Sequence, residues 1–119
     1  MKKLLIFEDD PQLFELLKMI LKPKGYTVVH RSDCYDVCAV VKEDKPDLIL
    51  MDLRIPDVGG AAATEALKGD AETKDIPVII LSADAKTKEI AAICGADGYI
   101  VKPFEVTDLE NIIHNHIKS

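Results

Sequence analysis

The sequence lacks any long hydrophobic run. A membrane-spanning helix needs about 20 consecutive apolar residues, and because every apolar stretch here is much shorter, we expect no membrane insertion. The first ten residues, MKKLLIFEDD, begin like a signal peptide, but their apolar stretch is short, has no small-residue cleavage site and ends in acids. The sequence therefore predicts a cytoplasmic protein.

Cysteine and histidine are scarce. An odd number of cysteines in a cytoplasmic protein argues against a disulfide framework, and there are three: Cys34, Cys38 and Cys94. Cys34 and Cys38 lie four residues apart on an expected helix, and we interpret them as packing residues that share one face. The histidines show no ligand spacing and are interpreted as surface or helix-end residues: His30, His114 and His116.

Positive charge is also limited. The chain has 15 basic and 21 acidic residues, a net charge of −6 and no basic cluster. Nucleic-acid binding depends on neutralising phosphates with clustered Lys and Arg. We therefore expect no direct contact between this chain and nucleic acid.

What the chain does have is a regular alternation of short apolar runs and helical patterns. Its 119 residues suit one domain, which we place at residues 1–119 with no output domain. The strand-like runs are Leu4–Phe7, Tyr26–Val29, Leu48–Met51, Val78–Leu81 and Tyr99–Val101. Three of them are almost continuously apolar, which is typical of strands buried on both faces. The pattern predicts an α/β fold in which five strand–helix units form an open parallel sheet with helices on both faces.

Capping residues indicate where several helices begin and end. Asp10 followed by Pro11 is typical of an N-cap and a first helical residue. Asp33 is expected to begin the second helix, and Gly95 to end the fourth. The segment 107–110, Thr-Asp-Leu-Glu, has the capping-box pattern and is expected to open the last helix.

Charged and hydroxyl side chains follow four of the five expected strands. The first strand ends in 8–10, Glu-Asp-Asp, the third in Asp52, the fourth in Ser82 and the fifth in Lys102, whereas segment 30–32 after the second shows no comparable pattern. Ligands of open α/β sheets bind beyond the carboxyl ends of the strands. If the first and third strands are neighbours, their acids meet at that edge.

This set of side chains suits phosphoryl transfer. Clustered carboxylates favour a hard divalent cation with oxygen ligands, and Mg²⁺ suits a few carboxylates together with waters and a phosphate. A lysine and a hydroxyl can bind phosphoryl oxygens, as Lys102 and Ser82 would. The candidate nucleophile is Asp52, because an aspartate can form an acyl phosphate.

Four segments in order resemble the marker segments of the response-regulator receiver domain, the chemotaxis-type module of two-component signalling: FEDDP, LILMDLRIP, VIILSA and YIVKPF. The resemblance covers the whole chain. It implies a flavodoxin-like (βα)5 fold with strand order 2-1-3-4-5.

The resemblance also implies a metal site with a phosphoryl acceptor. Asp52 would be the acceptor and a Mg²⁺ ligand. Asp9 would bind the ion directly, and Glu8 mostly through water. Arg54 would contribute its backbone carbonyl. Lys102 would contact Asp52 and then a phosphoryl oxygen.

Two further residues would form a conformational switch. Ser82 would be the switch hydroxyl and Tyr99 the switch aromatic residue. The bond between Lys102 and Pro103 would be cis, which only X–Pro bonds adopt at small energetic cost.

The function implied is that of a phosphorelay receiver. A sensor histidine kinase or phosphotransfer protein would donate a phosphoryl group from a phosphohistidine to Asp52, with Mg²⁺ bound. The surface of the fourth helix, fifth strand and fifth helix would then control a target protein or output domain. Such a chain is no turnover enzyme, since it catalyses only its own phosphorylation and dephosphorylation.

Other classes of protein fit less well. A receiver-like module that binds partners without phosphorylation would share every motif. An aspartate-nucleophile phosphatase of the haloacid-dehalogenase type requires a second acid two residues after the nucleophile, where this chain has Arg54. A flavodoxin-like flavin binder requires a phosphate-binding loop after the first strand, and the sequence EDDP would repel a phosphate.

Overall fold

Five strands and five α-helices alternate along the described part of the chain. The structure is a computed structural model that describes residues 2–56 and 58–117. The strands are β1 (Lys3–Phe7), β2 (Thr27–Arg31), β3 (Leu48–Asp52), β4 (Val78–Ser82) and β5 (Gly98–Val101). The helices are α1 (Pro11–Leu21), α2 (Val37–Asp44), α3 (Gly60–Lys68), α4 (Thr87–Cys94) and α5 (Val106–His116), and a 3-10 turn, η1, covers Lys22–Lys24.

The strands form one parallel sheet in the order β2-β1-β3-β4-β5. This confirms the predicted α/β class and the strand order implied by the resemblance. The register pairs Phe7 with Met51, and Asp52 with Leu81. Because the strands are parallel and end at matched levels, the residues that follow them leave the sheet at the same edge.

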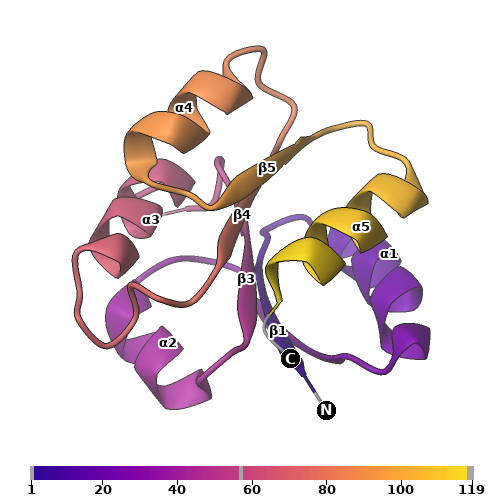
Figure 1. Cartoon of the computed structure of the whole chain (residues 1–119), viewed down its shortest axis with the longest axis horizontal. Helices are drawn as coiled ribbons and strands as arrows, with labels where there is room; N and C mark the ends of the chain where they lie inside the picture. Colours follow the sequence, from indigo (N-terminus) through magenta and orange to yellow (C-terminus); the bar gives the residue numbers. More distant parts are fainter. Residues whose placement is uncertain (1, 57, 118–119) are drawn as a thin grey trace.

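Alternate residues of each strand pack into two separate apolar layers. Leu4 and Ile6 of β1 belong to the layer that also holds α1 and α5 residues, whereas Leu5 and Phe7 belong to the layer under α2, α3 and α4. Figure 1 shows the same arrangement, with α1 and α5 on one side of the sheet and the other three helices opposite. Successive side chains of a strand point to opposite faces. Since both faces are covered, the strands contain the continuous apolar runs seen in the sequence.

The predicted start of α2 is wrong, because the preceding residues form a turn. Asp33 Oδ1 accepts a hydrogen bond from the amide of Tyr35 at 3.1 Å, which closes a short turn instead of capping a helix. The helix begins at Val37, after Asp36 in the left-handed region at φ 52°.

The later helix start separates two cysteines. Cys34 precedes α2, and its Sγ donates to the Pro56 carbonyl at 3.0 Å, whereas Cys38 lies within the helix. The two side chains therefore do not share a helix face, which corrects the prediction. The three cysteines, all within the described residues, form no disulfide.

The capping box at 107–110 is also wrong. Helix α5 begins at Val106, after Glu105 in extended conformation, and the Glu105 carbonyl accepts hydrogen bonds from the amides three and four residues later. Thr107 therefore lies inside the first turn. The expected N-cap of α1 is confirmed: the Asp10 carboxylate accepts hydrogen bonds from the second and third amides of the helix.

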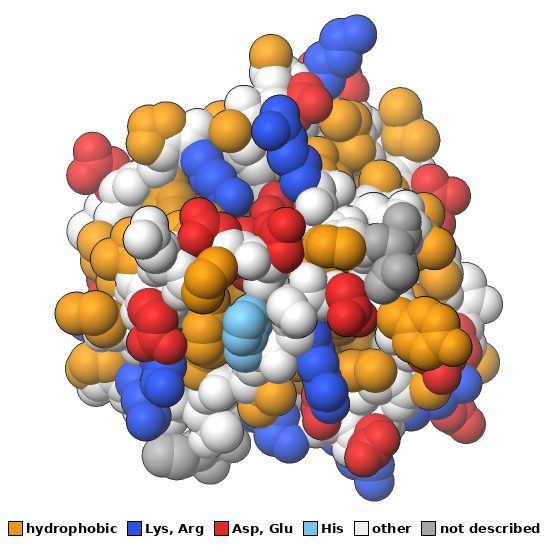
Figure 2. Space-filling model, turned by 180° about the vertical axis from the view of Figure 1, so that it is seen from behind, with side chains coloured by type: hydrophobic (Ala, Val, Ile, Leu, Met, Phe, Trp, Pro, Cys, Tyr) orange, Lys and Arg blue, Asp and Glu red, His pale blue; other side chains and the backbone are white. Residues whose placement is uncertain are grey.

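The surface is mixed in character. The face shown in Figure 2 carries acidic and basic side chains interspersed, with hydrophobic side chains between them. Among the described residues, no helix combines the length and apolar character needed to cross a membrane.

Candidate functional site

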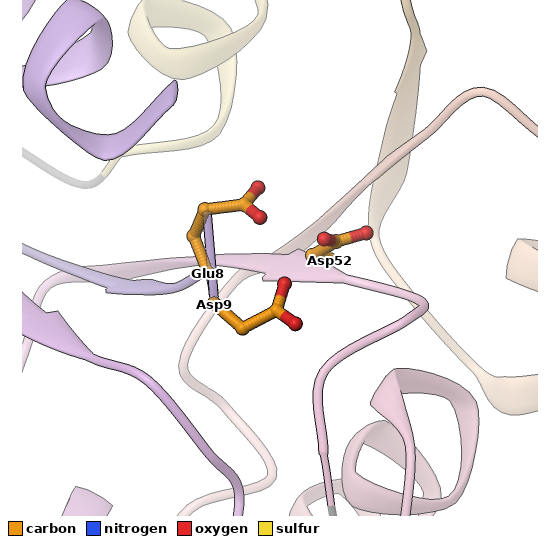
Figure 3. Close-up of side chains that lie close together, drawn as sticks. All are labelled: Glu8, Asp9 and Asp52. Atoms are coloured by element: carbon orange, nitrogen blue, oxygen red, sulfur yellow. The ribbon is translucent and has the colours of Figure 1, made fainter. Parts of the chain in front are cut away.

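Three carboxylates from two neighbouring strands meet at the carboxyl edge of the sheet. Glu8 and Asp9 come directly after β1, and Asp52 is the last residue of β3. Each offers a carboxylate oxygen, and these oxygens all lie within 4.8 Å of one another. In Figure 3, the side chains of Glu8 and Asp9 extend from the end of β1 toward Asp52. These three residues are called the acidic cluster below.

Burial makes the acidic cluster unfavourable when all its members are charged. Glu8 is 1% exposed and Asp52 is 6% exposed, whereas Asp9 lies at the exposed rim. The pKa of Glu8 is raised from 4.5 to about 7, mainly by burial and in addition by the hydrogen bond with Asp52 and the charge of Asp52. The Asp10 amide and the charge of Lys102 oppose this shift. The site therefore favours either a proton on Glu8 or an added cation.

Lys102, which directly follows β5, brings positive charge to the acidic cluster. The amide of Lys102 donates to the Ser82 carbonyl at 2.8 Å, which holds the end of β5 beside the end of β4. Its Nζ lies 3.5 Å from Glu8 Oε1 and 3.7 Å from Asp52 Oδ2. The peptide bond between Lys102 and Pro103 is cis. One lysine does not neutralise three carboxylates, so the donor set fits a divalent cation with oxygen ligands.

The backbone after β3 holds Asp52 in place. The amide of Arg54 donates to Asp52 Oδ1 at 3.2 Å, while the Arg54 side chain is exposed. The amide of Gly60, at the start of α3, donates to the Leu53 carbonyl at 3.1 Å. A Cβ atom at Gly60 would overlap the carbonyl oxygen of Asp52. The close approach of α3 to the end of β3 therefore requires glycine at this position.

Ser82 and Tyr99 lie on neighbouring strands. Ser82 is 4% exposed, and its Oγ accepts a hydrogen bond from the Asp84 amide at 3.0 Å. A hydroxyl that accepts one bond can still donate its own proton. Tyr99 is 37% exposed and pairs in register with Ile80, two residues before Ser82.

His30 contacts the site, and the sequence reasoning missed it. The expectation of a surface or helix-end histidine is wrong here, because His30 is half-buried in β2, in register with Ile6. Its Nε2 lies 2.7 Å from the Glu8 carbonyl oxygen, and its ring stacks on Phe14 with centroids 3.9 Å apart. The sequence placed His30 directly after the expected second strand, and that position near the edge where the acids gather was the available signal; in the structure β2 extends through Arg31 and includes it.

Comparison with known proteins identifies relatives over most of the chain. A family model described as the response regulator receiver domain matches residues 4–114. The DNA-binding dual master transcriptional regulator RpaA of Synechocystis sp. is 36% identical over 111 residues, which cover 92% of this chain and 46% of RpaA. The chain spans about half the length of the curated relatives it matches.

Solved structures with the same fold include receiver domains of histidine kinases. The receiver domain of the sensor histidine kinase PA1611 from Pseudomonas aeruginosa, crystallised with a magnesium ion in its active site cleft, is 28% identical with a TM-score of 0.89, covering 99% of this chain and 98% of that one. The receiver domain of a histidine kinase from Syntrophus aciditrophicus is 32% identical with a TM-score of 0.88, covering 97% and 89% of the two chains.

The chain belongs to the response regulator receiver domain family. It is a signalling domain of the two-component type, which confirms the resemblance carried by the four sequence segments. Its relatives include both a DNA-binding regulator and histidine kinases. Family membership therefore defines the signalling module rather than the output that it controls.

Proposed function

We propose that Asp52 accepts a phosphoryl group from a phosphohistidine, with Mg²⁺ held by Glu8, Asp9, Asp52 and the backbone carbonyl of Arg54. The observation that carries the proposal is the convergence of three carboxylates at the ends of β1 and β3 within 4.8 Å, beside a lysine that directly follows β5. That combination of metal ligands, nucleophile and cation suits phosphoryl transfer.

The roles of the three carboxylates differ with their burial. Asp9 is exposed at the rim and would bind the ion directly, whereas Glu8 lies buried behind it and would act mostly through water. When bound, Mg²⁺ supplies positive charge that offsets carboxylate repulsion and stabilises phosphoryl oxygens. The magnesium ion in the P. aeruginosa relative supports the same cofactor here.

The transfer step exchanges one bond to phosphorus for another. A carboxylate oxygen of Asp52 attacks the phosphorus while the bond from phosphorus to the donor imidazole breaks, and the electron pair of that bond stays on the imidazole nitrogen. Lys102 binds a phosphoryl oxygen through Nζ, and Ser82 donates its O–H to another. These two contacts stabilise the charge that spreads over the phosphoryl oxygens in a loose transition state.

Phosphorylation would then change the surface formed by α4, β5 and α5. Ser82 moves toward the phosphoryl group, and Tyr99, which is 37% exposed at present, turns inward. This biases a two-state element, because the new contacts form in only one of its states. The donor is a sensor histidine kinase or phosphotransfer protein, and the receiver of the signal is a target protein or output domain that binds α4-β5-α5.

The proposed domain comprises residues 1–119 and acts as a cytoplasmic signalling module rather than a turnover enzyme. We keep the prediction that these residues make no direct contact with nucleic acid, since the net charge is −6. RpaA is named as a DNA-binding protein, but this chain matches only 46% of it. A shift assay with this chain and duplex DNA would test the prediction.

The acceptor assignment is tested by intact-mass measurement. The protein is incubated with Mg²⁺ and acetyl phosphate or phosphoramidate, and the wild type is expected to gain the mass of one phosphoryl group, which EDTA prevents. Asp52→Asn should gain none. A wild type that gains no mass would favour the alternative of a partner-binding module, and an undiminished gain in Asp52→Asn would reject the acceptor.

A further inference from the structure

The backbone of Glu8, one residue of the acidic cluster, is bound to β2 by two hydrogen bonds. The Glu8 amide donates to the Arg31 carbonyl at 3.0 Å, and the Glu8 carbonyl oxygen lies 2.7 Å from Nε2 of His30. The first bond continues the regular ladder between β1 and β2. The second uses a side chain, at the residue where β1 has already ended.

The chemistry of the two partners determines the direction of the second bond. A carbonyl oxygen can only accept a hydrogen bond, so Nε2 of His30 carries the proton and donates it. The ring is also held in its plane, because it stacks on Phe14 of α1 with an interplanar angle of 12°. Phe14 is buried, and its own amide donates to the Asp10 carbonyl at 3.0 Å.

The acceptor of this bond occupies a critical position. The Glu8 carbonyl belongs to the peptide unit that joins Glu8 to Asp9, and the plane of that unit sets the directions in which the two side chains leave the backbone. A further hydrogen bond, from the Asp10 amide to Glu8 Oε2 at 3.2 Å, holds the Glu8 carboxylate over the same backbone segment. The His30 bond therefore restrains the orientation of this peptide plane, in addition to the bonds made by the Glu8 and Asp10 amides.

We propose that His30 is a positioning residue for the metal site. Its Nε2–H fixes the orientation of the peptide plane between Glu8 and Asp9, and thereby the directions of the two carboxylates that would bind Mg²⁺. The proposal rests on the function proposed above. Groups that orient metal ligands without contacting the ion are a common feature of metal sites, and their loss typically lowers metal affinity by about 10- to 100-fold. His30 acts through the backbone of its neighbour rather than through the ligand side chain.

Two substitutions separate the hydrogen bond from the ring packing. His30→Phe keeps an aromatic ring to stack on Phe14 and removes the donor, whereas His30→Gln keeps an N–H donor and removes the ring. Mg²⁺ dissociation constants are measured by isothermal titration calorimetry, and thermal unfolding is followed in EDTA. We expect His30→Phe to weaken Mg²⁺ binding about tenfold, and His30→Gln to recover most of the affinity.

The outcomes distinguish this role from a purely structural one. Unchanged Mg²⁺ affinity in His30→Phe, or an equal loss in both variants, would overturn the positioning role while leaving the metal site intact. A wild type that binds no Mg²⁺ would overturn the metal site itself, and this role with it. Nitrogen-15 NMR of the wild-type imidazole gives a test that does not depend on the folding of any variant: a proton on Nε2 is expected, and a neutral ring with its proton on Nδ1 would reject the proposal.

Discussion

At the scale of single residues, Lys102 combines two tasks that a neutral side chain of similar length could not perform. Its Nζ lies between the buried carboxylates of Glu8 and Asp52, at 3.5 and 3.7 Å, and we propose that it binds a phosphoryl oxygen during transfer. Lys102→Met should therefore slow phosphorylation by phosphoramidate about 100-fold or more, since removing one charge-stabilising donor typically costs that much in rate. The rate of mass gain at fixed Mg²⁺ measures the effect.

A matched lysine provides the control. Lys74 is exposed and precedes β4, so it lies toward the amino edge of the sheet, away from the acidic cluster. Lys74→Met should phosphorylate at the wild-type rate. Equal slowing in both variants would point to general charge effects instead of a role in the site.

Glu8 supplies a second residue-scale prediction, on pH. Its pKa in the folded protein is about 7, above the value of 4.5 for the unfolded chain, so the folded state holds the extra proton between these values. The stabilising contribution of Glu8 to the metal-free protein should therefore be fully present below about pH 4.5 and be lost as the pH rises through 7, a change of up to about 3 kcal/mol. Urea unfolding in EDTA at several pH values measures the slope.

The variant Glu8→Gln tests this contribution, because it removes the ionisable carboxyl group and keeps a side chain of nearly the same size. Its stability should depend less on pH between 5 and 7 than that of the wild type. Identical slopes in the two proteins would show that Glu8 does not carry the raised pKa. Mg²⁺ should flatten the wild-type profile, because it competes with the proton on Glu8.

At the scale of elements, the junction between β3 and α3 depends on one glycine. The first residue of α3 lies so close to the end of β3 that a methyl group on Gly60 would overlap the Asp52 carbonyl oxygen. Since the obstacle is backbone, relief requires α3 to move away. Gly60→Ala should destabilise the protein by about 1–3 kcal/mol and slow phosphorylation at Asp52. Urea denaturation and the mass assay measure the two effects.

The other end of α3 offers the matched control. A Cβ atom at Gly69 would lie 3.4 Å from the Glu65 carbonyl oxygen, an ordinary contact distance, and Gly69 has a φ of −87° that alanine can adopt. Gly69→Ala should therefore change stability little. A mild effect at Gly60, similar to that at Gly69, would contradict the close packing of α3 on β3.

The elements also show which local signals predicted helix boundaries well. Asp10 caps α1 as expected, because Pro11 immediately follows and forces a start at that point. Asp33 and the pattern at 107–110 predicted starts at the wrong residues. In both cases the sequence motif fits a helix cap, but the helix begins at another residue because of the conformation of the preceding loop. The local sequence rules for caps do not describe that conformation.

At the scale of the whole molecule, the acidic cluster should link metal binding to folding. The three carboxylates come from segments 8–9 and 52, which approach one another only when β1 and β3 pair, so Mg²⁺ should bind the folded state in preference to the unfolded one. At a Mg²⁺ concentration ten times its dissociation constant, the free energy of unfolding should rise by about 1.4 kcal/mol. Thermal or urea unfolding with and without Mg²⁺ measures this increase.

Asp9→Asn is the informative variant for this linkage. Asp9 is exposed, so the substitution leaves the apolar layers unchanged while it removes a proposed direct ligand. The increase in stability should largely disappear. If the variant is stabilised as much as the wild type, or if NaCl of equal ionic strength stabilises the wild type equally, the ion does not bind at this cluster.

The sequence alone determined the strands, their parallel arrangement and the residue types at their carboxyl ends. The apolar runs report burial on both faces, and the acids, hydroxyl and lysine stand directly after them in the chain. The tertiary structure decided the rest. It set the raised pKa of Glu8, the ion pair between Lys102 and Glu8, which are 94 residues apart, and the hydrogen bond between His30 and Glu8, which are 22 residues apart. Each of these depends on how closely distant segments pack and how much water they exclude.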